Sequence, residues 1–274
     1  MSQSLLVKIF GFPATLIHGD TLVLDRWMWL KKRLPITFNG ESLVDIGCGT
    51  GAFTIGASLR GYKSLGLSWD ERNQLVAEQR KSICNALFAS FDILDVRKLD
   101  SKTELLESFD IAVCCENIEH ILDDLKLMKD VAAVIKPGGR LLLTTPYYYY
   151  QAITGEDNGP FCKEETGWHV RRGYTEAMLV ELLNHAGLIH ESTSYISGFV
   201  SQKTTFYFRI LSKVNLLMAW ILILPLRIFP PIFDRVITDM VGWSYYSICI
   251  EAYKPRYNKE SKKSEILKDT RLVI

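Results

Sequence analysis

Short apolar runs alternate with longer amphipathic stretches along the chain from about residue 41. Nearly continuous apolar runs are typical of strands covered on both faces, whereas the longer stretches have helical periodicity. The expected strands are 43–46, 64–67, 87–91, 111–114 and 140–145, with two later candidates at 191–196 and 245–252. The expected helices are 51–59, 71–84, 103–107, 124–135 and one from Thr175 to about Gly187, with a Lys-Pro-Gly-Gly turn at 136–139. This alternation predicts an α/β fold with a doubly wound, mostly parallel sheet.

Three segments lie outside this alternation. Residues 1–40 contain an amphipathic stretch with Trp27 and Trp29, and we expect an N-terminal helical cap there. Residues 146–174 form a long loop, a kind of segment that is often functional. Residues 198–243 are expected to form an apolar helical insertion. The ligand-binding domain itself is expected at 41–197 and 244–254, followed by a basic, solvated tail at 255–274.

The insertion contains an unbroken apolar run at 216–226, flanked by Lys213 and Arg227. A membrane-spanning helix needs roughly 20 apolar residues, and three prolines interrupt this region. The segment 206–233 is therefore interpreted as a peripheral contact with a membrane, a hydrophobic lid or a homodimer interface.

Composition and charge exclude several classes of protein. The 274 residues suit one domain with appendages, and 32 basic against 31 acidic residues do not favour a nucleic-acid partner. The six cysteines show no C-x-x-C spacing, which favours buried thiols in a reducing compartment. The first residues do not have the pattern of a secretory signal. We expect a cytoplasmic protein, with peripheral membrane association as an extension of that expectation.

A glycine-rich turn follows the first strand, in the sequence Asp45-Ile-Gly-Cys-Gly-Thr-Gly51. Glycine allows a tight bend and a close approach to a ligand because it has no Cβ. A phosphate-binding loop would carry a lysine, and in a dinucleotide-binding G-x-G-x-x-G turn the third glycine would come one residue later. The motif therefore favours a sulfonium nucleoside over a nucleotide.

Residues 41–187 and the final strand resemble the class I S-adenosylmethionine-dependent methyltransferases. The resemblance implies a seven-stranded Rossmann-like sheet that binds S-adenosylmethionine at the carboxyl ends of its strands. The implied cofactor-binding residues are Asp45, Gly47, Cys48, Gly49, Gly51, Ser68, Trp69, Asp70, Asp95, Val96 and Cys115.

Two positions test the resemblance further. After the second strand the family usually has an acid that binds the ribose, but this chain has Ser68. Either Asp70 reaches back to the ribose, or Ser68 and water bind it while Asp70 caps the next helix. After the third strand, Asp95 matches the acid that contacts adenine, and the Val96 amide would face the ring.

The stretch Glu116-Asn-Ile-Glu119-His120 follows the fourth strand. If a helix begins there, Glu116, Glu119 and His120 share one face and could hold Mg²⁺ or Mn²⁺. This arrangement resembles the ubiquinone-pathway O-methyltransferases and the small-RNA terminal 2′-O-methyltransferases. The RNA branch adds a histidine from the loop after the fifth strand, where this chain has His169. The resemblance thus implies Glu116, His120 and His169 as catalytic residues, and these three with Glu119 as metal ligands.

Other interpretations remain open for these residues. Without a metal, Glu119 and His120 would organise the loop, and His120 or His169 would act as general base. His18, His185 and His190 have no partner pattern. The tyrosines at 147–150 either line the acceptor pocket or pack the lid. Arg171 and Arg172 either contact an anionic acceptor or face solvent.

The sequence favours an S-adenosylmethionine-dependent methyltransferase that acts, most simply by O-methylation, on a small acceptor of apolar or membrane-associated character. One alternative is a metal-dependent RNA 2′-O-methyltransferase, which would need a basic groove and a stacking platform. The other is a non-catalytic cofactor-binding or membrane-adaptor protein.

Overall fold

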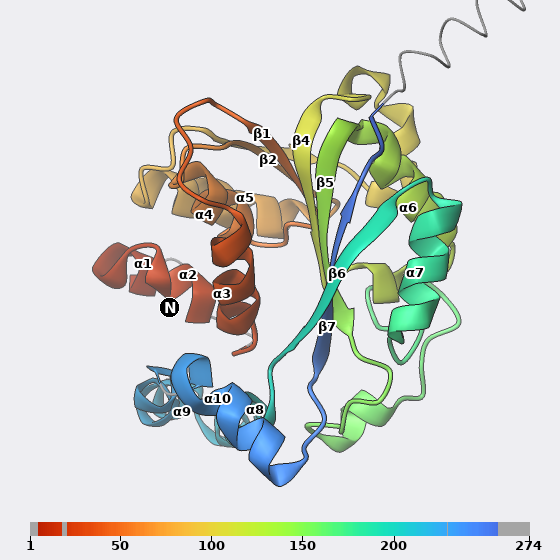
Figure 1. Cartoon of the computed structure of the whole chain (residues 1–274). Helices are drawn as coiled ribbons and strands as arrows, with labels where there is room; N and C mark the ends of the chain where they lie inside the picture. Colours follow the sequence, from red (N-terminus) through yellow and green to blue (C-terminus); the bar gives the residue numbers. More distant parts are fainter. Residues whose placement is uncertain (1–4, 18–20, 229, 257–274) are drawn as a thin grey trace, which may run out of the picture.

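The seven expected strands form one sheet in the order β3-β2-β1-β4-β5-β7-β6 (Figure 1). The computed structural model describes residues 5–17, 21–228 and 230–256. β1 to β5 pair in parallel, and β7 pairs antiparallel with both β5 and β6. The strands are β1 Ser42–Ile46, β2 Lys63–Ser68, β3 Ala89–Ile93, β4 Phe109–Cys115, β5 Ile135–Pro146, β6 Ile189–Ile196 and β7 Ser247–Tyr253. The predicted mostly parallel, doubly wound sheet is confirmed.

The predicted turn at 136–139 was wrong, because β5 already begins at Ile135. The Gly138 amide donates to the Lys254 carbonyl at 2.8 Å, and the Lys254 amide donates to the Gly139 carbonyl at 2.9 Å. The segment that follows β7 therefore extends the pairing of β5 across the two glycines. Local sequence suggested a turn, but a partner more than a hundred residues away supplies the hydrogen bonds.

Helices cover both faces of the sheet (Figure 1). Along β1, Leu43 packs against the side with Trp27 and Trp29, whereas Val44 and Ile46 pack with Leu127 on the other side. This two-sided burial explains why the strands read as continuous apolar runs. The helices of the alternating region are α4 Ala52–Ser58, α5 Glu71–Ile83, α6 Asp124–Val134 and α7 Glu176–His185, and the 3₁₀ turns are η1 Val96–Ser101, η2 Thr103–Leu105, η3 Ile118–His120 and η4 Gly155–Asn158.

Two helical groups lie outside the alternating units and meet each other. The N-terminal group is α1 Leu5–Phe10, α2 Pro13–Ile17 and α3 Val23–Arg33, and the group between β6 and β7 is α8 Phe199–Val214, α9 Leu216–Ile223, η5 Pro225–Ile228 and α10 Pro230–Val241. Buried Asp25 accepts a hydrogen bond from the Ser197 hydroxyl at 2.9 Å, and Thr21 bonds Thr205. Within the described residues, none of the helices has the length and apolar character needed to cross a membrane.

Candidate active site

The glycine turn lies at the carboxyl end of β1. The amides of Gly47 and Cys48 donate to the Leu67 carbonyl at 3.0 and 2.9 Å, which bends the chain away from the sheet. Gly47, Gly49 and Gly51 have φ angles of 80°, 52° and 79°, in the left-handed region that favours glycine. A Cβ placed on Gly49 would meet no atom within 4 Å. The turn therefore presents bare backbone to open space at Gly49.

A cavity of about 400 Å³ adjoins this turn, and we name it the glycine-turn cavity. It also reaches the ends of β2, β3 and β4. Seven of the eleven expected cofactor-binding residues line it: Gly47, Gly49, Ser68, Trp69, Asp70, Asp95 and Val96. The sequence motifs thus converge on one space, although they are spread over about fifty residues.

The other four expected cofactor-binding residues are not among those that line this cavity. Asp45 is 1% exposed and accepts a hydrogen bond from the Thr54 hydroxyl at 2.7 Å, and burial raises its pKa to about 6. Cys48 and Cys115 are buried. A Cβ on Gly51 would lie 2.6 Å from the Phe91 ring, so this glycine permits close packing. All four of these residues are buried.

Asp70 and Asp95, the acids expected to contact the ribose and the adenine, both have protein partners. The Asp70 carboxylate accepts hydrogen bonds from the amides of Arg72 and Asn73 at 2.9 and 3.5 Å, so it caps α5. Asp95 pairs with Arg97 at 2.6 Å, and hydrogen bonds from Arg97 lower the Asp95 pKa. Arg97 also pairs at 2.6 Å with Glu165 of the 146–174 loop. That loop is therefore tied to the rim of the glycine-turn cavity.

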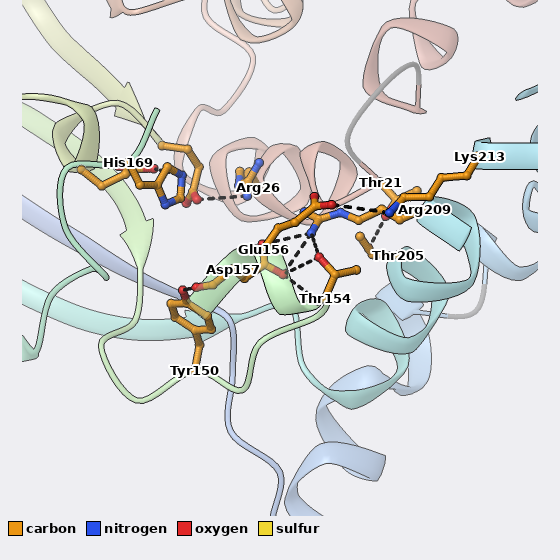
Figure 2. Close-up of polar contacts among 12 residues, drawn as sticks. Thr21, Arg26, Tyr150, Thr154, Glu156, Asp157, His169, Thr205, Arg209 and Lys213 are labelled. Carbon is orange, nitrogen blue, oxygen red and sulfur yellow. Dashed lines mark hydrogen bonds and ion pairs between the residues drawn. The ribbon is translucent and has the colours of Figure 1, made fainter. Parts of the chain in front are cut away.

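A second cavity of about 620 Å³ adjoins the first, and we name it the histidine cavity. Glu116 and His120 line both cavities. Glu119 and His169 also line the second one, together with Arg26 of α3 and Arg209 of α8. Figure 2 shows His169, Arg26 and Arg209 in this region. The N-terminal cap and the insertion therefore both contribute to its wall.

The expected helical face of Glu116, Glu119 and His120 was wrong. Glu116 has a left-handed φ of 49°, and only the short turn η3 follows it. Its carboxylate pairs with Arg26 at 3.1 Å and accepts from the Thr144 and Ser247 hydroxyls at 3.1 and 3.2 Å. The three residues therefore do not share a helical face, and Arg26 and two hydroxyls hold the Glu116 carboxylate.

Glu119, His120 and His169 form a compact cluster without Glu116. One potential ligand atom from each lies within 4.8 Å of the others. Glu119 Oε1 is 3.8 Å from His120 Nε2 and 3.9 Å from His169 Nε2. The two imidazole rings meet edge to face, with centroids 4.7 Å apart. Tertiary structure thus brings together three of the four residues expected at the metal site.

Burial disfavours the charged forms of the three side chains in this cluster. Burial, followed by the negative charge of Glu116, raises the pKa of Glu119 well above its usual value. Burial and the neighbouring His120 lower the pKa of His169 to about 4, and burial also lowers the pKa of His120. Neutral imidazoles are the form that binds metals.

The tyrosines and arginines around the loop have structural contacts. None of the tyrosines at 147–150 is among the residues that line the histidine cavity; Tyr246 is. Tyr150 is buried against Tyr246, so packing is the role seen for it. Arg171 pairs with Asp124, and Arg172 donates to the carbonyls of Tyr148 and Tyr150 at 2.9 and 2.8 Å. Neither arginine lines the cavity.

Comparison with known proteins agrees with this geometry. The family model described as a methyltransferase domain matches residues 25–192, which is more than half of the chain. The chain belongs to this methyltransferase family. The expected membership in the class I S-adenosylmethionine-dependent methyltransferases is thereby confirmed.

The relatives of this methyltransferase domain extend the comparison. This chain is 26% identical over 133 residues to a ubiquinone biosynthesis O-methyltransferase of Pseudomonas savastanoi pv. phaseolicola. The match covers 47% of this chain and 55% of that protein. The chain thus spans about half the length of the curated relatives it matches. Phosphoethanolamine N-methyltransferase 2 of Haemonchus contortus has a TM-score of 0.62 at 17% identity, covering 93% of this chain and 60% of that one. A Mesorhizobium loti S-adenosylmethionine-dependent methyltransferase has a TM-score of 0.54 at 19% identity, and the match covers 84% of this chain and 97% of that one.

The sequence analysis did not identify several residues that line the two cavities. Arg26, Arg209 and Asp157 line the histidine cavity, and Arg97 and Glu165 line the glycine-turn cavity. Arg26, Arg209 and Glu165 belong to no short motif, because their partners Glu116, Asp157 and Arg97 are distant in sequence. Of the unassigned histidines, His185 is exposed and His190 bonds Thr193, whereas His18 and the tail from residue 257 lie outside the described residues.

Asp70→Ala should lower the free energy of unfolding of this methyltransferase by about 1 kcal/mol, the usual effect of losing a helix N-cap. Asp123→Ala is a matched control, because Asp123 caps α6 by accepting from the Lys126 amide at 2.9 Å. Urea unfolding should show similar losses for both. An unchanged unfolding free energy in Asp70→Ala would contradict the capping role. A tenfold loss of S-adenosylmethionine affinity in Asp70→Ala but not in Asp123→Ala would indicate that Asp70 also contacts the ribose.

Proposed function

We propose that this methyltransferase transfers the methyl group of S-adenosylmethionine to an oxygen of a small acceptor. The observation that supports this most directly is the meeting of the two cavities at Glu116 and His120. A donor in the glycine-turn cavity and an acceptor in the histidine cavity would face each other across these residues. The curated O-methyltransferase relatives support oxygen as the acceptor atom.

The glycine-turn cavity suits the proposed donor. The missing Cβ of Gly49 leaves open space at the turn, which is where the methionine part would pass. Ser68 and Asp70 would lie at the ribose, and Asp95 and Val96 at the adenine. The bound sulfonium supplies an activated methyl group. The chain's own contribution is therefore mainly to align the donor with the acceptor, and alignment supplies much of the rate in such displacements.

The cluster of Glu119, His120 and His169 supports a divalent cation as a second cofactor. Glu119 Oε1 is buried and has no hydrogen-bond partner among the described residues. Two imidazoles and one carboxylate suit Mn²⁺ or Zn²⁺ better than Mg²⁺, which prefers oxygen ligands. Such an ion would lower the pKa of an acceptor hydroxyl. We do not include Glu116 among the ligands, because its carboxylate pairs with Arg26.

The alternative role of His169 as general base receives less support. A catalytic base works best when its pKa is near the working pH, but the pKa of His169 is about 4. Such an imidazole is a weak base at neutrality, although it remains available as a ligand.

The experiment that tests this proposal combines the protein with methyl-labelled S-adenosylmethionine and with soluble or membrane extracts, with and without a chelator. We expect labelled product that disappears on chelation and returns with added Mn²⁺. Methyl transfer that is insensitive to the chelator would contradict the proposed metal cofactor but support the proposed methyl transfer. An absence of labelled product from every extract would contradict the proposed activity.

The exposed surface of the insertion supports an apolar or membrane-associated acceptor. Leu216, Leu217, Met218, Ile221 and Leu222 of α9 are all at least 50% exposed. Contiguous exposed apolar patches of this kind mark contacts with membranes or other proteins. Of the two basic residues that flank the apolar run, only Lys213 is exposed, whereas Arg227 is buried at 3% exposure. We propose membrane contact through α9, with self-association as the competing explanation.

A double substitution, Leu217→Glu with Ile221→Glu, should abolish sedimentation with liposomes while leaving the unfolding temperature nearly unchanged. Both side chains are half exposed or more, so charges there disturb little packing. A parent protein that does not sediment with lipid, but grows in size with concentration in a way that the variant does not, would instead identify a homodimer interface.

A further inference from the structure

The wall of the histidine cavity contains two arginines from outside the sheet units, Arg26 of α3 and Arg209 of α8. Arg26 pairs with Glu116, at the junction of the two cavities. In Figure 2, His169 and Arg209 lie on opposite sides of Arg26. Arg209 therefore lines a part of the cavity that Arg26 separates from His169 in this view.

Arg209 holds a carboxylate from the protein itself. Its Nη1 donates to both carboxylate oxygens of Asp157 at 3.0 Å, and to the Thr154 hydroxyl at 3.4 Å (Figure 2). The guanidinium side chain is 32% exposed, and Asp157 lines the same cavity. An oxyanion is thus already bound to a cation within the cavity wall.

Asp157 also has a hydrogen-bond partner within its own loop. Its carboxylate also accepts from the Thr154 amide at 2.8 Å and completes the capping box of η4. If Arg209 turned to another oxyanion, Asp157 would keep this backbone hydrogen bond. The guanidinium would exchange one anionic partner for another, so neither state would leave its charge uncompensated.

We propose that Arg209 recognises an oxyanion of the acceptor, a carboxylate or a phosphate, and that Asp157 occupies the guanidinium until the acceptor replaces it. The guanidinium fork matches both of these groups. The inference rests on the proposed function, because it assigns the acceptor to the histidine cavity. The acceptor then has its reacting hydroxyl near Glu116 and His120 and its anionic group near Arg209.

A competing explanation is that Arg209 and Asp157 only fasten α8 to the loop. Lys213 pairs with Glu156 at 3.4 Å, and this contact joins the same two segments. The two explanations predict opposite results for Asp157→Asn, which keeps an oxygen acceptor for the Thr154 amide. Loss of a fastening contact weakens ligand binding, whereas loss of an internal competitor strengthens it.

The test is a calorimetric titration of the protein, alone and with S-adenosylhomocysteine, with benzoate and with inorganic phosphate in separate experiments. We expect at least one anion to bind, about tenfold or more weakly to Arg209→Gln, severalfold more tightly to Asp157→Asn, and unchanged to Lys213→Gln. Which anion binds distinguishes a carboxylate from a phosphate acceptor. If Asp157→Asn does not fold, Asp157→Ser is titrated in its place, because serine also has a side-chain oxygen that can cap η4.

The inference is overturned if neither anion binds, if Arg209→Gln binds them as the parent does, or if removing the Asp157 charge weakens binding. The labelled-extract assay separates this failure from that of the proposed function. A labelled product that behaves as neutral on anion exchange at pH 7 overturns the inference and leaves methyl transfer intact. Anion binding with the expected variant effects, but without methyl transfer, supports the oxyanion site and contradicts the proposed activity.

Discussion

Gly49→Ala should lower the affinity for S-adenosylmethionine by roughly 10- to 100-fold, because one extra methyl group in a tight site costs about 1–3 kcal/mol. Gly49 lines the glycine-turn cavity, and its Cβ would enter space that no protein atom occupies within 4 Å. The substitution should therefore be tolerated by the empty protein and opposed by the cofactor. Calorimetric titration with S-adenosylmethionine measures the effect.

Gly187→Ala is the matched control for this prediction. Gly187 also has a left-handed backbone, with a φ of 79°, and a Cβ there meets no atom within 4 Å. Both substitutions should reduce the unfolding free energy by about 1–2 kcal/mol, because alanine is disfavoured in this conformation. Only Gly49→Ala should weaken cofactor binding. Equal affinities in the two variants would show that the cofactor does not pass Gly49.

His169→Ala should reduce kcat by about two to three orders of magnitude, since a bound metal ion supplies several kcal/mol of transition-state stabilisation. His169 contributes one of the three potential ligand atoms of the cluster, and it comes from the loop. Its loss should leave two ligands and weaken Mn²⁺ binding, while S-adenosylmethionine affinity changes little. Activity and Mn²⁺ titrations on the same preparation check both effects.

His185→Ala serves as the comparison for this variant, because His185 is exposed at the end of α7 and lines neither proposed cavity. It should retain parental activity and metal binding. If His169→Ala is inactive although the parent transfers methyl groups in the presence of a chelator, His169 acts without a metal. If His169→Ala is as active as the parent, the cluster has no part in the reaction.

The sequence predicted the parts of the molecule that depend on local pattern. Continuous apolar runs identify strands buried on both faces, and the spacing of Gly47, Gly49 and Gly51 identifies a turn that a ligand can approach. Because parallel strands end at one edge of the sheet, motifs after β1, β2 and β3 were expected to meet there. They do line one cavity.

Local pattern was less informative where two alternatives used the same residue. Asp70 follows β2 at a distance that suits either a ribose contact or a helix cap, and the two amides of α5 that it accepts from are seen only in the folded chain. Lys136 to Gly139 has the composition of a turn, but pairing with Lys254 makes it part of a strand. In both cases a partner, and not the sequence itself, selects the conformation.

The sequence by itself determined the sheet, the glycine turn and membership in the methyltransferase family. Only the tertiary structure decided how the acidic and basic side chains are paired. The Glu116 carboxylate pairs with Arg26 of the distant helix α3, whereas Glu119 lies with the two histidines. Arg209 meets Asp157 across 52 residues, because α8 packs beside the loop. Periodicity is a property of neighbouring residues, but these charge pairs depend on how distant elements pack, and no local pattern encodes that.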